Sequence, residues 1–202
     1  MNHTNLTGSL TFPEGLTSIG DYALYNCRGF TGNLILPEGV TSIGSRAFSG
    51  CSGFTGSLTL PEVITSIGDW AFFGCSGFTG NLIWPEGITS IENGTFSGCV
   101  GITSVDIPNS VTTIGNSAFS GCRGLTSVDI PNSVESIGEM AFMNCGSLTS
   151  VTIGASVKSI GDYAFYGCNK ITTVTIPESV TYLGNGTFVC CTGLTDIHVG
   201  NL

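Results

Sequence analysis

Apolar and polar residues alternate over short stretches of this chain, and almost every stretch ends at a proline. Val128 and Ile130, for example, alternate with polar residues and are followed directly by Pro131. A two-residue period is typical of a half-buried β-strand, and proline lacks the backbone donor that would continue the strand ladder. The pattern therefore predicts a short strand that ends at the proline.

A second, shorter extended segment and a turn are expected to follow each strand. Val134 and Ile137 are spaced to point inward, and Gly138 then permits a tight bend. Phe142 is a large apolar residue of the turn, and Asn144 stands where most copies of the pattern have glycine. Glycine or asparagine at one fixed place indicates a backbone with positive φ.

The whole pattern recurs every 24 residues in the first four copies and every 23 residues afterwards. The cysteine row consists of Cys27, Cys51, Cys75, Cys99, Cys122, Cys145, Cys168 and Cys191. The aromatic row consists of Phe48, Phe72, Phe96, Phe119, Phe142, Phe165 and Phe188. A fixed period in this range indicates a repeat protein in which each coil stacks on the next. We therefore expect one mainly β solenoid of eight to nine coils over residues 1–202.

Stacking places equivalent residues in rows, and three aliphatic-rich rows are expected to form a continuous core. The first strand row is Leu10, Leu34, Leu58, Leu82, Val105, Val128, Val151, Val174 and Ile197. The second strand row is Phe12, Leu36, Leu60, Trp84, Ile107, Ile130, Ile153, Ile176 and Val199. The row of the shorter segments is Ile19, Ile43, Ile67, Ile91, Ile114, Ile137, Ile160 and Leu183.

Composition and charge exclude two classes of partner. Hydrophobic residues make up 41% of the chain and charged residues only 9%, so the surface must consist largely of Ser, Thr, Asn and Gly. The net charge is −9 and the five basic residues are scattered. Nucleic acids and anionic membrane surfaces require clustered basic side chains, so neither is expected to bind. No uninterrupted apolar stretch is long enough to insert into a membrane.

The two ends of the chain give expectations about its context. The first residues lack the basic and apolar regions of a signal peptide. The period is already running at Leu10, and neither end resembles the capping repeat that solenoids generally need. We expect a fragment of a longer secreted protein or an uncapped array, and a cytoplasmic chain is an open alternative.

The run LTSVDIPNSVESIGEMAFMNC, residues 125–145, resembles the BspA-type (Treponema-like) leucine-rich repeat. The similarity extends from about Leu10 to Val199. The first four coils depart from it by one extra residue, and Gly154 stands where proline belongs. The resemblance implies a right-handed solenoid with a parallel sheet on the concave face and short strands and turns on the convex face. It also implies cell-surface or secreted proteins that bind other proteins or host matrix.

The cysteines suggest disulfides or metal binding, but their spacing favours neither. No CxxC pair occurs, so zinc-ligand spacing is absent. One cysteine per coil, in register with the core rows, is typical of a small buried apolar residue. Cys190 differs because it replaces the glycine or asparagine of the positive-φ position, and we expect it to be a reactive thiol. A disulfide between Cys190 and Cys191 is the open alternative.

The outward positions of the predicted strands form the candidate binding face. These residues are Ile35, Thr59, Ile83, Asp106, Asp129, Thr152 and Thr175. Ile35 and Ile83 are apolar residues on an otherwise polar open face, which points to a binding role, although single exposed apolar residues are common. The face is expected to dock a protein, and the alternative is a strand surface with no binding role.

Aromatic residues and methionines outside the core rows lie in the turn segments, on the expected convex side. They are Tyr22, Tyr25, Trp70, Phe73, Tyr163, Tyr166, Met140 and Met143. Such side chains are enriched in protein interfaces. Packing between neighbouring coils explains them equally well.

No catalytic constellation or cofactor motif is visible. The two histidines, His3 and His198, stand near opposite ends, and no nucleophile, base and orienting group can be assembled from a periodic coil. We predict no enzyme activity, no cofactor and no metal. The expected function is a non-catalytic protein-interaction or adhesion module. The alternative is a self-assembling or spacer solenoid that stacks through uncapped ends, for instance as a homodimer.

Overall fold

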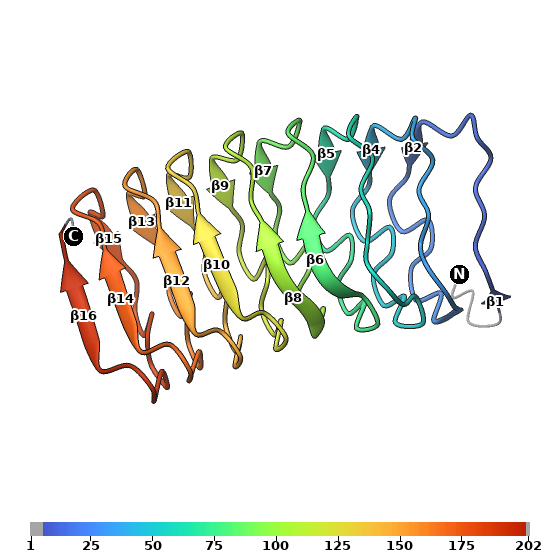
Figure 1. Ribbon diagram of the computed structural model, residues 1–202. Coiled ribbons are helices and arrows are strands. Elements are labelled where there is room, and N and C mark those ends of the chain that lie inside the picture. The colour runs from blue at the N-terminus through green and yellow to red at the C-terminus, as the bar shows by residue number, and fades with distance from the viewer. Residues whose placement is uncertain (1–5, 201–202) are drawn as a thin grey trace.

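The predicted strands stack as the parallel rungs of a solenoid. The protein is described here from a computed structural model, which covers residues 6–200, and these residues form strands and turns without a helix. Figure 1 shows the coils following one another in a single line from one end of the array to the other. The mainly β, parallel, repetitive fold expected from the sequence is therefore confirmed.

The longer strands lie side by side on one face, which we call the long-strand face (Figure 1). They are β6 (Thr79–Ile83), β8 (Gly101–Asp106), β10 (Ser127–Ile130), β12 (Ser150–Ile153), β14 (Thr173–Ile176) and β16 (Asp196–Val199). Parallel ladders join β6, β8, β10 and β12 into one sheet and pair β14 with β16. Each register advances by one repeat, for example from Val128 to Val151.

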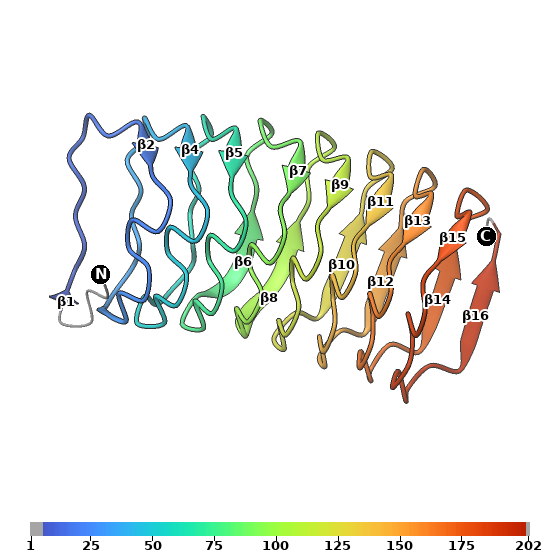
Figure 2. The same cartoon turned by 180° about the vertical axis from the view of Figure 1, so that it is seen from behind.

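Two-residue strands line the other side of the array, seen from behind in Figure 2. They are β2 (Ser18–Ile19), β4 (Ser42–Ile43), β5 (Ser66–Ile67), β7 (Ser90–Ile91), β9 (Thr113–Ile114), β11 (Ser136–Ile137), β13 (Ser159–Ile160) and β15 (Tyr182–Leu183). One further short pair, β1 (Thr7–Gly8) and β3 (Gly29–Phe30), lies near the amino-terminal end.

The extra residue of the early coils changes their strands. The predicted strands around Ile35 and Thr59 are reduced to a single bridge between these two residues. Gly32, Gly56 and Gly80 have φ values of 80°, 78° and 82°, a left-handed conformation that glycine adopts without strain. The ladder between β6 and β8 slips by one residue next to Gly80, where the period changes from 24 to 23. The additional residue of the early coils thus coincides with a left-handed glycine, and the register shifts where the 23-residue coils begin.

The core consists of continuous columns of side chains. Neighbouring rings of the phenylalanine row are stacked, with centroids 5.1 Å apart at Phe72–Phe96 and 6.2 Å apart at Phe96–Phe119. The aliphatic rows expected to point inward are buried through the middle of the array, except for Ile107 and Val151, which are half-buried. Burial of these rows supplies the main favourable free energy of folding.

The last coil is an exception to the expected inward rows. Leu183, Ile197 and Val199 continue three buried rows, yet all three are exposed, and Val199 is 78% exposed. Within residues 6–200 no further coil packs on them. These three side chains therefore lack a cover at this end of the described array, whereas Ile19 in the first coil is buried.

Candidate binding surfaces

The seven outward residues predicted to form a binding face lie at one register position of the long-strand face. Ile83 pairs with Asp106, and Asp106 pairs with Asp129 in the next strand. Asp129 in turn pairs with Thr152. The bridge of Ile35 to Thr59 precedes this series, and Thr175 follows it, paired with His198. We call the seven residues Ile35, Thr59, Ile83, Asp106, Asp129, Thr152 and Thr175 the outer row. The geometry brings them into line; a binding role for them remains a prediction.

Two apolar side chains stand out from this polar surface. Ile35 is 72% exposed and Ile83 is 59% exposed. Shallow depressions lie on both sides of Ile35, one of about 270 Å³ that also touches Thr59 and Pro61, and one that touches Phe12. An exposed isoleucine beside a depression is the kind of feature that a partner side chain can cover.

Two carboxylates lie next to each other at the centre of the outer row. The Nδ2 group of Asn81 donates a hydrogen bond of 2.6 Å to Asp106. Ser104 fixes that amide by donating to its Oδ1 atom at 2.9 Å. Asp129 is the ladder neighbour of Asp106. Like charges on facing positions of neighbouring strands repel each other, so a donor or cation from a partner would relieve this pair.

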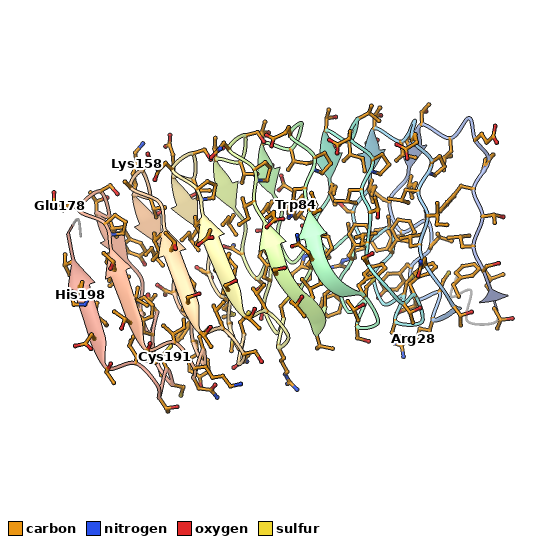
Figure 3. All side chains as sticks on the ribbon, in the orientation of Figure 1. Arg28, Trp84, Lys158, Glu178, Cys191 and His198 are labelled. Atoms are coloured by element: carbon orange, nitrogen blue, oxygen red, sulfur yellow. The ribbon has the colours of Figure 1, made fainter. Side chains whose placement is uncertain are left out.

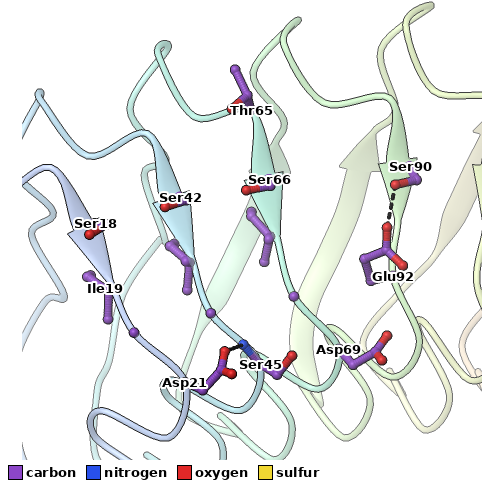
Figure 4. Close-up of a pocket in the computed structure, with 15 residues that line it drawn as sticks. Ser18, Ile19, Asp21, Ser42, Ser45, Thr65, Ser66, Asp69, Ser90 and Glu92 are labelled. Carbon is purple, nitrogen blue, oxygen red and sulfur yellow. Dashed lines mark hydrogen bonds between the residues drawn. The ribbon is translucent and has the colours of Figure 1, made fainter.

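A polar trough runs across the short-strand side, and sequence analysis did not single it out. Its volume is about 600 Å³. The hydroxyl groups of Ser18, Ser42, Ser66 and Ser90 line it in a row (Figure 4). Ser90 donates a hydrogen bond to Glu92, which stands where the other coils have glycine. The recurring Ser-Ile-Gly segment was the signal for this trough.

The carboxylates beside the trough already have structural partners. Asp21 accepts a hydrogen bond of 2.7 Å from the backbone N–H of Ser45 in the next coil. Asp69 accepts one of 3.0 Å from the backbone N–H of Asn93 in the same way. Asx side chains are well suited to satisfying such free backbone donors. These groups join neighbouring coils, and we therefore assign the trough no ligand.

The repeating cysteines are buried thiols that join coils. Each of seven thiols donates to a backbone carbonyl of the preceding coil; Cys99, for example, donates to the carbonyl of Phe72 at 3.2 Å. Burial raises the pKa of Cys51 and of Cys122 to about 12. Since the thiolate is the reactive form, these side chains are inert structural groups.

Cys190 is the exposed exception among the cysteines. Its φ is 61°, so it occupies the left-handed position where other coils have glycine or asparagine. A hydrogen bond with the Cys190 side chain raises the pKa of the Tyr166 phenol. Its neighbour Cys191 is buried and donates to the carbonyl of Phe165. High reactivity of Cys190 remains a prediction.

The sequence predicted neither catalysis nor a metal site, and the positions of the histidines and of the other metal-ligating side chains bear on this. His198 lies on β16 at the carboxyl-terminal end of the array (Figure 3), and His3 lies outside the described residues. Among residues 6–200 no three His, Cys, Asp or Glu side chains form a group that could hold a metal ion. Residues 6–200 also contain no helix that could span a membrane.

Comparison with known proteins identifies the repeat. A sequence profile described as BspA type Leucine rich repeat region, with six copies, matches residues 1–126 and 112–202. No curated protein matches the chain. The crystal structure of a T. pallidum leucine-rich repeat protein is 30% identical, with a TM-score of 0.62 over 93% of this chain and 77% of that one.

Two further crystal structures share the fold. A leucine-rich cell surface protein from Faecalibacterium prausnitzii is 24% identical, with a TM-score of 0.50 over 98% of this chain and 80% of that one. A leucine-rich repeat protein from Bacteroides ovatus is also 24% identical, with a TM-score of 0.51 over 98% and 70%. At this identity the two structures bear on the fold alone.

Proposed function

Since this chain belongs to the BspA-type leucine-rich repeat family, we propose that it is a non-catalytic module that binds a partner protein through its long-strand face. Leucine-rich repeats are scaffolds for protein interaction, and extended solenoid surfaces suit that role. The observation that carries the proposal is the pair of isoleucines, Ile35 and Ile83, exposed in the outer row. Every other member of that row is threonine or aspartate.

The outer row combines the components of an interface. Exposed aliphatic side chains contribute apolar area, and the hydroxyl groups around them form a polar rim. The adjacent carboxylates of Asp106 and Asp129 favour a partner that presents lysine, arginine or amide donors between them. Contacts spread over several coils would make the isoleucines the energetic centre of the interface.

We place the module at a cell surface, where it acts in adhesion to host or matrix proteins. The support is the family, since resemblance to the BspA-type repeat implies cell-surface or secreted proteins.

The test uses substitutions that the fold already tolerates. Threonine occupies the same register at Thr59 and Thr152, so Ile35→Thr and Ile83→Thr keep a β-branched side chain. The double variant and wild type are passed over an immobilised panel of purified matrix and cell-surface proteins. We expect the double variant to bind about tenfold more weakly or worse, as for hot-spot residues.

Val63→Thr is the matched control because Val63 is an exposed aliphatic residue in the turn after Pro61, away from the outer row. It should bind as wild type does. Equal binding by wild type and the Ile35→Thr/Ile83→Thr variant would refute a role for the outer row. Absence of any binder in the panel would favour the spacer alternative.

A second candidate function is assembly through the ends. Leu183, Ile197 and Val199 form an exposed apolar surface on the last coil, and exposed strand edges and coil faces favour pairing with another copy. Light scattering at rising protein concentration tests it. A mass that rises with concentration in wild type and stays constant in Val199→Lys supports end-to-end assembly, and a constant mass in both excludes it.

A further inference from the structure

The turn segments place one residue of each coil at a left-handed position on the edge of the array. Tyr22, Arg46, Trp70, Ser117, Met140 and Tyr163 hold this position with φ between 55° and 57°; we call the three aromatic members, Tyr22, Trp70 and Tyr163, the aromatic edge. Gly94 and Gly186 hold the same position in two other coils, with φ of 60° and 61°. An L-residue is strained there and glycine is not. The backbone therefore needs no side chain at this place, and the large side chains require another explanation.

Three of these side chains form two-ring clusters with an aromatic residue three positions later. The ring centroids of Tyr22 and Tyr25 are 5.6 Å apart, those of Trp70 and Phe73 are 5.4 Å apart, and those of Tyr163 and Tyr166 are 6.0 Å apart. All three pairs are edge-to-face. Tyr22 and Tyr163 are exposed and Trp70 is half-buried. Packing between coils accounts for part of each ring and leaves the rest open to solvent.

The chain itself shows what such a ring can hold. The guanidinium carbon of Arg46 lies 5.8 Å from the centroid of the Tyr22 ring, within the range of a cation–π interaction. The Nη1 group of Arg46 also donates to the Tyr22 hydroxyl at 3.5 Å. Arg46 is the left-handed residue of the coil after Tyr22. A ring at this register thus accepts a guanidinium group from the next coil.

The corresponding residue after Trp70 and after Tyr163 is a glycine. A Cβ atom placed on Gly94 would lie 2.1 Å from Cε3 of Trp70 and 2.4 Å from both ring neighbours of that atom. A point in that relation to three consecutive ring atoms lies over the ring face, so the indole lies flat against Gly94. A Cβ on Gly186 would lie 2.5 Å from Cε1 of Tyr163. Each ring thus packs on the glycine backbone of the next coil, and the part of the ring that faces away from this glycine is the part left open to a partner.

Acidic residues accompany the edge. Asp69 precedes Trp70 and Asp162 precedes Tyr163. The whole chain carries 14 acidic residues against five basic ones. The Asp162 carboxylate accepts hydrogen bonds from Asn185 and Tyr182, which lowers its pKa and keeps it ionised. Electrostatic complementarity therefore favours a cationic occupant.

We propose that the aromatic edge is a second binding surface, distinct from the outer row, that takes an arginine-containing segment of a basic protein. Guanidinium groups of the partner would lie against the solvent-exposed parts of the Trp70 and Tyr163 rings, with the same cation–π chemistry that joins Arg46 to Tyr22. Trp70 and Tyr163 are four coils apart, or about 19 Å at ~4.8 Å per coil. An extended segment of roughly six residues spans that distance at about 3.3 Å per residue.

The test is a titration of the protein into a fluorescent peptide of alternating arginine and glycine. Binding is measured as a rise in the fluorescence anisotropy of the peptide. A peptide with citrulline in place of arginine keeps the shape and removes the charge. We expect the arginine peptide to bind, to weaken as salt is added, and to bind more tightly than the citrulline peptide. Absence of binding by the arginine peptide, or equal binding by the two peptides, would overturn the proposal.

Glycine variants test whether the aromatic rings contribute to peptide binding while the coils stay folded. Trp70→Gly and Tyr163→Gly introduce the residue that Gly94 and Gly186 already provide at this register, so the coils should keep their structure. Each substitution should lower the affinity for the arginine peptide about two- to fivefold, which corresponds to the strength of an exposed cation–π contact. Ser117→Gly is the matched control, since Ser117 has φ of 56° at the same register and no ring. If all three variants bind equally well, the rings have no role and the proposal fails.

Discussion

The repeating thiols show how one small side chain serves two purposes in this protein. All eight fill a place in the core, and seven of them donate to a carbonyl of the preceding coil, as Cys99 does to Phe72. Because the cysteines lie in register with the core rows of the sequence, their burial could be predicted. This register did not predict the hydrogen bond, because the direction of an S–H group depends on how closely the preceding coil approaches.

Thiol chemistry gives a prediction at the residue scale. At neutral pH a thiol reagent should modify Cys190 rapidly and the eight buried cysteines only after unfolding. Counting modified thiols on native and denatured protein checks this directly. Fast modification of several thiols in the native protein would contradict the ladder of buried cysteines.

The same burial makes stability depend on alkaline pH. An unfolded thiol has a pKa of about 8.5, whereas burial raises the pKa of Cys51 and Cys122 to about 12. The native state therefore keeps protons that the unfolded state releases, so this stability is complete below the unfolded pKa and falls as the pH rises towards 12. Denaturant unfolding across this range should show a shallower alkaline loss in Cys51→Ala/Cys122→Ala than in wild type. Identical slopes of the free energy of unfolding against pH in the two proteins would contradict this contribution of the buried thiols.

At the scale of the coil, the sequence predicted the order of strand, short segment and turn, and it predicted the rows that become buried. The strands around Ile35 and Thr59 were predicted as full strands and are only a bridge. The reason is the extra residue of the early coils, which coincides with the left-handed Gly32, Gly56 and Gly80. Counting residues revealed the insertion, but only the backbone shows where the register shifts.

The left-handed glycines yield a prediction for single substitutions. A Cβ added at Gly80 would meet no atom within 4 Å, so Gly80→Ala tests the backbone conformation alone. With φ at 82°, we expect a loss of about 1–2 kcal/mol in the free energy of unfolding, measured by denaturant titration. Gly20→Ala is the matched control because Gly20 also has free space and lacks a positive φ. An equal effect of both substitutions would show that φ does not matter here.

At the scale of the surface, sequence reasoning placed the outer row correctly in line but missed the short-strand trough. Strand alternation fixes which side chains face outward, and that is why Ile83 and Asp106 could be paired in advance. The trough depends on the depth left between side chains, for example between Ser66 and Ser90, and no pattern of residue types gives a depth. The contact of Arg46 with Tyr22 was likewise invisible, because it requires the direction of the turn.

For the whole molecule, a stack of nearly equal coils separates stability from recognition. The core columns join neighbours and are the same in every coil, whereas the outer row and the aromatic edge differ from coil to coil. Ile35 and Ile83 interrupt a polar row, and Trp70 and Tyr163 interrupt an edge where glycine suffices. Recognition should therefore depend on the few positions where the repeat varies.

The most direct test compares the affinity of one bound partner protein for two variants of this chain. Ile35→Thr/Ile83→Thr alters the outer row, and Val199→Lys alters the exposed end of the last coil. The proposed function predicts that the outer-row variant loses about tenfold or more in affinity while Val199→Lys binds as wild type does. The reverse result, with binding lost at the end and kept in the row, would contradict it and assign recognition to the ends of the array.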